Sequence, residues 1–316
     1  MKFENTDVWG FEHALRGMRN PKNSWHLSDS WNMSFDDPEF AERGGYWIGP
    51  KDMKLAQALI KGGPEHRKFL RQIFVSVDIT APLYWWKEFD TYKVGTVANS
   101  TSTMHKLMSK PITRESFEMD DYNKDLIVTM YNENGLRDWY LNGFVDYLIE
   151  HLESLRFEYL RYDELIKNPD KSLETVEELE AKQYQVWKEL IRWLPESWLQ
   201  TRTVTMTYEN LLAMCSKSQR RPHKLNEWSG KRNPDLENFI KWARTLPYAQ
   251  EFIFFDELVS PGELCSKYLR EISSKLNHGP TFHHYGISVA FEDGKIKPIN
   301  VLLSELANKF DKKEKI

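Results

Sequence analysis

An alternating apolar run that ends at a proline sets the strongest constraint on how this chain folds. The apolar residues of 73–80 recur at every second position, which predicts a strand with one face in a core. Ala81-Pro82 ends that strand, and the aromatic run 84–89 then predicts a helical turn. Small and amide residues at 96–102 close the segment as a polar loop. The sequence therefore predicts strand, helix and loop in close succession here.

The rest of the chain predicts an α+β protein. Helical spacing is present at 52–61, at 65–72 and over the two long stretches 138–166 and 172–194, whereas 201–207 is a β-branched strand followed by a helix at 208–218. Turn signals interrupt every period in residues 1–50, so we expect irregular structure there. We predict one domain over 1–316, with a helical insertion over 105–195 and a C-terminal hairpin over 282–303.

Composition excludes several classes of protein. The formal net charge of −4 gives no basic footprint for nucleic acid, and no apolar run is long enough to span a membrane. Cys215 and Cys265 are too few and too far apart for a disulfide scaffold or a zinc cluster, and His283-His284 lacks metal-ligand spacing, so we expect no metal. The first residues lack a secretory pattern. We expect a cytoplasmic protein.

A basic turn follows the helix predicted at 208–218. Arg220, Arg221, His223 and Lys224 lie within five residues, and Trp228 is close by as a stacking surface. Arginine suits a bidentate grip on phosphate, and lysine adds a point charge. The turn is therefore a candidate phosphate site, with a solvated basic turn as the alternative.

The polar loop is a second candidate contact region. Asn99, Ser100 and Ser102 carry short side chains that can donate to phosphate or pyrimidine oxygens. The alternative is an ordinary capped loop, because these residue types also favour turns for local reasons.

The order strand, Ala-Pro, aromatic helix and polar loop resembles the signature segment of the flavin-dependent thymidylate synthases. In that family an Arg-His-Arg triplet falls where this chain has Thr91, Tyr92 and Lys93. The strand 201–207, its helix, the basic turn and the segment 249–253 (AQEFI, where the family has Ala-Gln-x-x-Ile) resemble the second nucleotide-binding stretch. The resemblance covers 52–104 and 196–254, about a third of the chain.

The resemblance implies a mixed sheet flanked by helices, in a homotetramer that holds FAD and deoxyuridylate between subunits. It implies methylation of deoxyuridylate to thymidylate, with methylenetetrahydrofolate as the carbon donor and NADPH as the reductant. The nucleotide contacts it implies are Asn99, Ser100, Ser102, Arg220, Arg221, His223 and Lys224. The flavin contacts it implies are His66, Arg71, Trp86, Lys87, Glu88, Tyr92 and Lys93.

Two other functions stay open at this point. A divergent pyrimidine-nucleotide C5 modifier could transfer a hydroxymethyl group or act on a cytidylate, because the triplet is lost. A non-catalytic nucleotide-binding or assembly protein could keep the scaffold alone. The sequence shows no Walker pattern and no nucleophile elbow. We expect Cys215 in the core, and no catalytic residue is assigned.

Overall fold

The computed structural model describes residues 1–40, 42–102, 107–132, 135–257, 289–292 and 295–298. The chain divides into two compact units, Met1–Leu258 and Val259–Ile316. In the second unit, β9 (Val289–Glu292) pairs antiparallel with β10 (Lys295–Pro298), inside the range predicted as a hairpin. The rest of that range, with Cys265 and His283-His284, lies outside the described residues.

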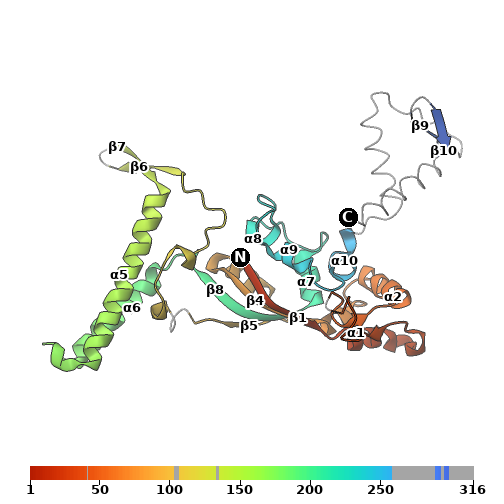
Figure 1. Ribbon diagram of the computed structural model, residues 1–316, viewed down its shortest axis with the longest axis horizontal. Coiled ribbons are helices and arrows are strands. Elements are labelled where there is room, and N and C mark those ends of the chain that lie inside the picture. The colour runs from red at the N-terminus through yellow and green to blue at the C-terminus, as the bar shows by residue number, and fades with distance from the viewer. Residues whose placement is uncertain (41, 103–106, 133–134, 258–288, 293–294, 299–316) are drawn as a thin grey trace. The chain divides into compact units, whose positions relative to one another are not determined.

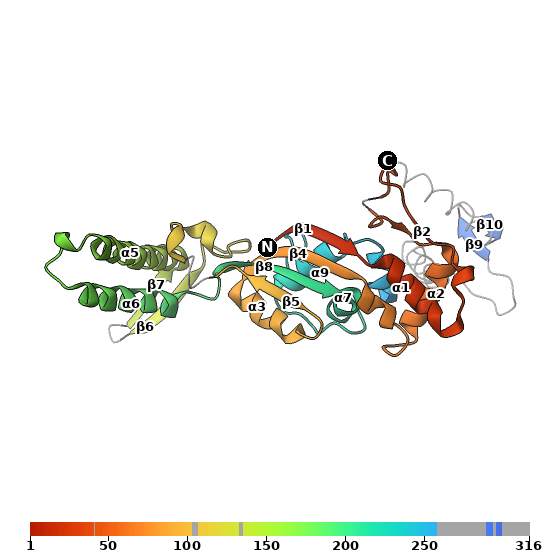
Figure 2. The same cartoon turned by 90° about the horizontal axis from the view of Figure 1, so that it is seen from below.

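The first unit is built on a four-stranded sheet in the order β1-β4-β8-β5 (Figures 1 and 2). The strands are β1 (Lys2–Trp9), β4 (Phe74–Pro82), β8 (Leu199–Thr207) and β5 (Val97–Ser100). The α+β class is as predicted, but the expected mixed sheet is wrong, because every pairing in this sheet is antiparallel. The chain leaves β1 at Trp9 and re-enters β4 at its partner Phe74, so β4 runs back along β1.

Residues 1–50 contain more regular structure than the sequence indicates. They form β1, α1 (Phe11–Arg19) and a small ribbon of β2 (Trp31–Asn32) and β3 (Tyr46–Trp47). β1 is an edge strand, and most of its side chains are exposed. An edge strand with so little burial does not show the apolar alternation that identifies a strand in a sequence.

One face of the sheet buries its apolar side chains in a core that it shares with helices. The helices are α1, α2 (Pro50–Lys61), α3 (Leu83–Phe89), α7 (Tyr208–Cys215), α8 (Asn226–Ser229), α9 (Phe239–Ala243) and α10 (Ala249–Phe252), and the short 3₁₀ helices η3 (Lys68–Gln72) and η4 (Asp90–Tyr92) precede β4 and follow α3. Val75, Val77 and Ile79 of β4 and Val204 of β8 are fully buried against this layer. The period-2 pattern of β4 therefore places its apolar face as predicted.

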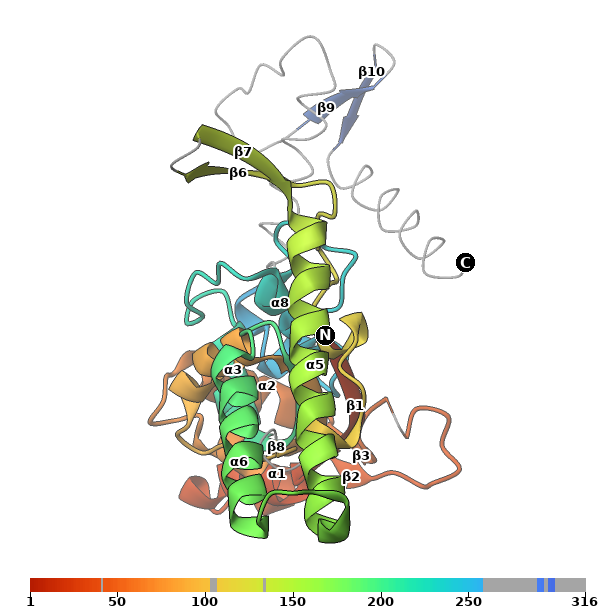
Figure 3. The same cartoon turned by 90° about the vertical axis from the view of Figure 1, so that its left-hand side faces the viewer.

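The segment between β5 and β8 packs around a core of its own. α5 (Leu141–Lys167) and α6 (Val176–Trp193) lie side by side, as Figure 3 shows, and bury Leu152 and Leu190 together with residues of the connector (107–122). A capping box at Thr175 and Glu178 starts α6. The sequence did not indicate the hairpin of β6 (Ile127–Asn132) and β7 (Gly135–Tyr140) before α5. None of the described helices is long and apolar enough to cross a membrane.

Candidate functional site

The site is centred on α3 and η4, directly after β4. Pro82 has extended backbone and stands as the N-cap residue of α3. The helix buries Trp85, Trp86 and Phe89. On the rest of the helix Lys87 is exposed and Glu88 is partly exposed.

The basic turn packs directly onto this helix. His223 is buried, and its ring stacks on Trp228 with 4.5 Å between ring centroids and 7° between planes. Its Nε2 lies 3.2 Å from the carbonyl oxygen of Met214, which can only accept, so Nε2 carries a hydrogen. Its Nδ1 lies 3.1 Å from Glu88 Oε1. His223 thus fixes the turn to α3.

Arg221 extends from the same turn over η4. Its Nη1 donates to Thr91 Oγ1 at 3.0 Å, and its guanidinium carbon lies 5.0 Å from the centroid of the Tyr92 ring. Burial raises the pKa of Tyr92, while the charge of Arg221 lowers it in part. The Oη of Tyr92 and the Nε1 of Trp228 are buried without a hydrogen-bond partner among the described residues. The Arg221 guanidinium therefore lies against η4.

A second arginine, which the sequence reasoning missed, reaches the same 3₁₀ turn from β8. Arg202 Nη1 donates to Asp90 Oδ1 at 3.1 Å, and its guanidinium carbon lies 4.2 Å from the centroid of the Trp86 ring. Its Nε donates to Gln200 Oε1 at 3.0 Å. Consecutive residues, Asp90 and Thr91, thus hold two guanidiniums. A signal was available, because Arg202 shares the β-strand period of buried Val204, where a charge is unexpected.

The other predicted nucleotide contacts lie elsewhere. Asn99 and Ser100 are exposed on the edge strand β5, opposite Thr203 and Arg202 of β8, respectively. Ser102 lines a cavity of about 1090 Å³. The cavity lies between the connector and the ends of β1, β4 and β8, and its wall includes Lys2, Thr80, Thr101, Lys110, Glu118 and Trp198.

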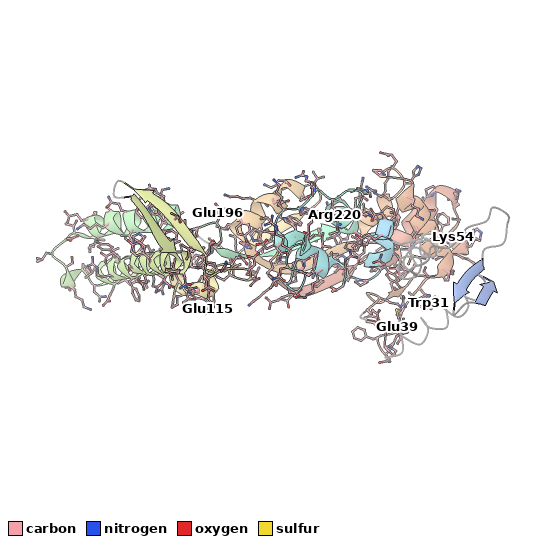
Figure 4. The ribbon with its side chains drawn as sticks, turned by 90° about the horizontal axis from the view of Figure 1, so that it is seen from above. Trp31, Glu39, Lys54, Glu115, Glu196 and Arg220 are labelled. Carbon is pink, nitrogen blue, oxygen red and sulfur yellow. The ribbon has the colours of Figure 1, made fainter. Side chains whose placement is uncertain are left out.

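Arg220 and Lys224 flank the two turn residues that pack on α3. The Arg220 guanidinium faces Cys215 O at 3.4 Å and Glu257 Oε1 at 3.9 Å, whereas Lys224 is exposed. Figure 4 labels Arg220 among the side chains. Burial raises the pKa of the Cys215 thiol, in line with its predicted place in the core. The structure thus brings Arg221 and His223 of the turn onto α3–η4 and directs Arg220 to another partner.

Two of the predicted flavin contacts, Trp86 and Lys87, have partners within this chain. Trp86 is buried and donates its Nε1 hydrogen to Gln200 O at 3.0 Å, and Lys87 donates to Glu196 Oε1 at 2.6 Å. Lys93 is exposed after η4, while His66 and Arg71 are exposed before β4. β4 has nine residues, which at about 3.3 Å per residue separate its two ends by roughly 30 Å. His66 and Arg71 lie before the start of β4, whereas Trp86 and Lys87 follow its end. After η4 the chain returns toward the start of β4, because Asn210 of α7 donates to Val94 O at 2.6 Å and the adjacent Glu209 pairs with Arg67.

Arg67, the residue next to His66, forms an ion pair with Glu209. Arg67 is buried, and its Nε lies 3.0 Å from both carboxylate oxygens of Glu209. Its Nη2 donates to Gln219 Oε1 at 3.0 Å. This ion pair connects the start of η3 with α7, and the bond to Gln219 extends it to the start of the basic turn. It was not identified from the sequence.

No known family matches this sequence, and no curated protein matches it. Among solved structures, the chain is similar to the flavin-dependent thymidylate synthase ThyX of Helicobacter pylori complexed with FAD and dUMP, with a TM-score of 0.44 and 14% identity over 81% of this chain and 99% of that one. It is also similar to the UMP/dUMP methylase PolB of Streptomyces cacaoi bound with 5-Br dUMP, with a TM-score of 0.39 and 10% identity over 79% of this chain and 92% of that one. The resemblance predicted from the sequence therefore holds as a structural similarity, which at these identities says nothing of substrate or cofactor.

Proposed function

We propose that this chain is a pyrimidine-nucleotide C5-modifying enzyme of the flavin-dependent thymidylate synthase kind, with its phosphate site at Arg221. In its specific form, the proposal is methylation of deoxyuridylate with methylenetetrahydrofolate as carbon donor and NADPH as reductant, by a cytoplasmic homotetramer. One observation carries it. The two stretches that resemble this family, more than a hundred residues apart, pack against each other at Thr91 and Tyr92.

That position is where the family has its Arg-His-Arg triplet. This chain lacks the triplet in sequence, but the folded protein supplies similar groups there from two segments. Arg221 brings a guanidinium to Thr91 and Tyr92, His223 brings an imidazole to Glu88, and Lys93 adds a cation next in the chain. The loss of the triplet from the sequence is therefore compatible with a cationic site in the folded chain.

The chemistry at Arg221 suits a phosphate monoester. A guanidinium has five N–H donors, and the contact with Thr91 takes one of them. Arg221 is exposed, so its remaining donors are accessible to a ligand. His223 is buried beneath and positions Glu88 and the turn instead of touching a ligand.

Flavin binding has less support within a single chain than the phosphate site has. Two of the residues that the resemblance assigns to FAD, Trp86 and Lys87, are engaged internally, so they do not fit as flavin contacts within this chain. We propose that residues of a second copy complete the flavin contacts, in keeping with the proposed homotetramer.

The decisive experiment combines growth and product analysis. A host that requires thymidine is supplied with the wild-type chain, Arg221→Ala or Arg220→Ala, and purified protein is incubated with dUMP or dCMP plus methylenetetrahydrofolate, NADPH and FAD. We expect growth and thymidylate with the wild type and with Arg220→Ala, and loss of both with Arg221→Ala. A hydroxymethylated or cytidylate product would favour the divergent C5 modifier, and nucleotide binding without product would favour the non-catalytic protein. Absence of nucleotide binding would overturn the proposal.

A further inference from the structure

Two carboxylates and one phenol lie close together where the connector contacts α3 and lies beside α8. Glu118 of the connector has its Oε2 3.3 Å from the Oη of Tyr84 on α3. The same hydroxyl forms a hydrogen bond with Oε1 of Glu227 on α8. Tyr84 and Glu118 are partly buried, and Glu227 is 9% exposed. We call Glu118, Tyr84 and Glu227 the carboxyl–phenol triad.

The two contacts of the Tyr84 hydroxyl require one more hydrogen than the phenol supplies. A phenol has one hydrogen, so Tyr84 can donate to only one of the two carboxylates. With that hydrogen on the bond to Glu227, the second contact is favourable only if Glu118 carries a proton and donates it to the oxygen of Tyr84. Glu118 Oε1 already accepts the backbone N–H of Asp120 at 2.8 Å, so Oε2 is the oxygen that carries the proton.

We propose that Glu118 binds a proton that locks the connector onto α3 and α8, and that the connector loosens when this proton is lost. An ionised Glu118 would face Glu227 across a single phenol oxygen, and like charges in a partly buried place repel. The backbone N–H of Glu118 donates to Ser197 O at 2.7 Å, so the same residue also fastens the connector to the strand β8 that follows. Loss of the proton would therefore remove the side-chain contact with Tyr84, and the neighbouring backbone bond to Ser197 would open more often.

The charges around the triad act in the same direction. Asp120 and Asp121 of the connector and Glu237 before α9 line the space beside Glu118 and Glu227. The N-terminal amino group lies 2.6 Å from Asp120 and offsets that one charge. Burial first, and then the carboxylates of Glu227, Asp121 and Asp120, raise the pKa of Glu118.

The site of this proton is distinct from the Arg221 site, but it touches the same elements. Tyr84 lies on α3 with Glu88, and Glu227 precedes Trp228, on which His223 stacks. Glu118 also lines the cavity that contains Ser102. The proton site consists of the triad alone, so it is independent of the ligand that the chain binds.

The test follows the proton and the connector in the full chain without ligand. Carboxyl carbons of glutamate are labelled for NMR titration, and the wild type is compared with Glu118→Gln, Glu227→Gln and Glu115→Gln. Glu115 is an exposed carboxylate of the same connector, labelled in Figure 4, and serves as the control. We expect one signal that titrates above 4.5, the ordinary value, to be absent in Glu118→Gln and to shift toward 4.5 in Glu227→Gln. A wild type without such a signal, or no shift in Glu227→Gln, would overturn the proposal.

Amide hydrogen exchange at Glu118 gives a second readout. After correction for intrinsic rates, we expect protection of this amide to fall as the pH rises through the folded-state pKa in the wild type and in Glu115→Gln, and to stay constant in Glu118→Gln. The wild-type measurement stands by itself if a variant fails to fold. Protection that does not change with pH in the wild type would show that no proton locks the connector.

Discussion

Replacing Arg221 by alanine should weaken nucleotide binding far more than the same change at its neighbour Arg220. The two side chains are adjacent in sequence but face different partners. Arg221 lies exposed over Tyr92 and donates to Thr91, whereas Arg220 faces Cys215 O and Glu257. Both changes remove one positive charge, so the pair separates a local phosphate contact from a general charge effect.

The magnitude follows from the contacts available to each arginine. A charge-assisted hydrogen bond to phosphate contributes about 1.5–3 kcal/mol, which corresponds to a loss of roughly tenfold to a hundredfold in affinity for dUMP in Arg221→Ala. The folded state should lose only about 1 kcal/mol, from an exposed cation–π contact and one hydrogen bond to a hydroxyl. Arg220→Ala should bind dUMP within about twofold of the wild type, because long-range attraction between exposed charges is screened by salt.

Isothermal titration with dUMP at one fixed salt concentration measures this difference, and thermal unfolding of each variant checks that it is folded. Arg221→Lys keeps the charge and loses the planar fork, so its affinity should lie between the wild type and Arg221→Ala. Equal losses in Arg220→Ala and Arg221→Ala would refute the assignment of the phosphate to Arg221. Unchanged affinity in both variants would favour the alternative interpretation, in which the basic turn is a solvated surface without a phosphate site.

Three further predictions concern groups in the core. Arg67→Met should lower the free energy of unfolding by about 3–5 kcal/mol, because it leaves Glu209 largely buried and unpaired, and Arg67→Met/Glu209→Leu should recover much of the loss in denaturant titrations. Burial raises the pKa of the Cys215 thiol, so in a Cys265→Ser background a thiol-reactive disulfide should label the unfolded chain and not the native one. Burial also raises the pKa of Tyr46 to about 12, so the stability from this group is complete below pH 10 and is lost as the pH rises through about 12, whereas Tyr46→Phe should lack that dependence in alkaline unfolding.

Much of the fold follows from local patterns in the sequence. The strand predicted at 73–80 is β4 at Phe74–Pro82, and the strand predicted at 201–207 is β8 at Leu199–Thr207. The long helical patterns correspond to α5 and α6. These elements bury one face each, so apolar period alone identifies them. β1 was not predicted, because its side chains are largely exposed and leave little apolar period to detect.

The sequence by itself determined which groups are present at the candidate site, and only the tertiary structure decided which of them meet. The basic turn, the aromatic helix and the polar loop can all be read from local composition. The pairings cannot, because Arg221 and Thr91 are 130 residues apart and His223 and Glu88 are 135 apart. Antiparallel pairing of β4 with β8 brings α3 and α7, with the turn that follows it, into one layer over the sheet. Contacts between the ends of different strands depend on that pairing, which no local pattern encodes.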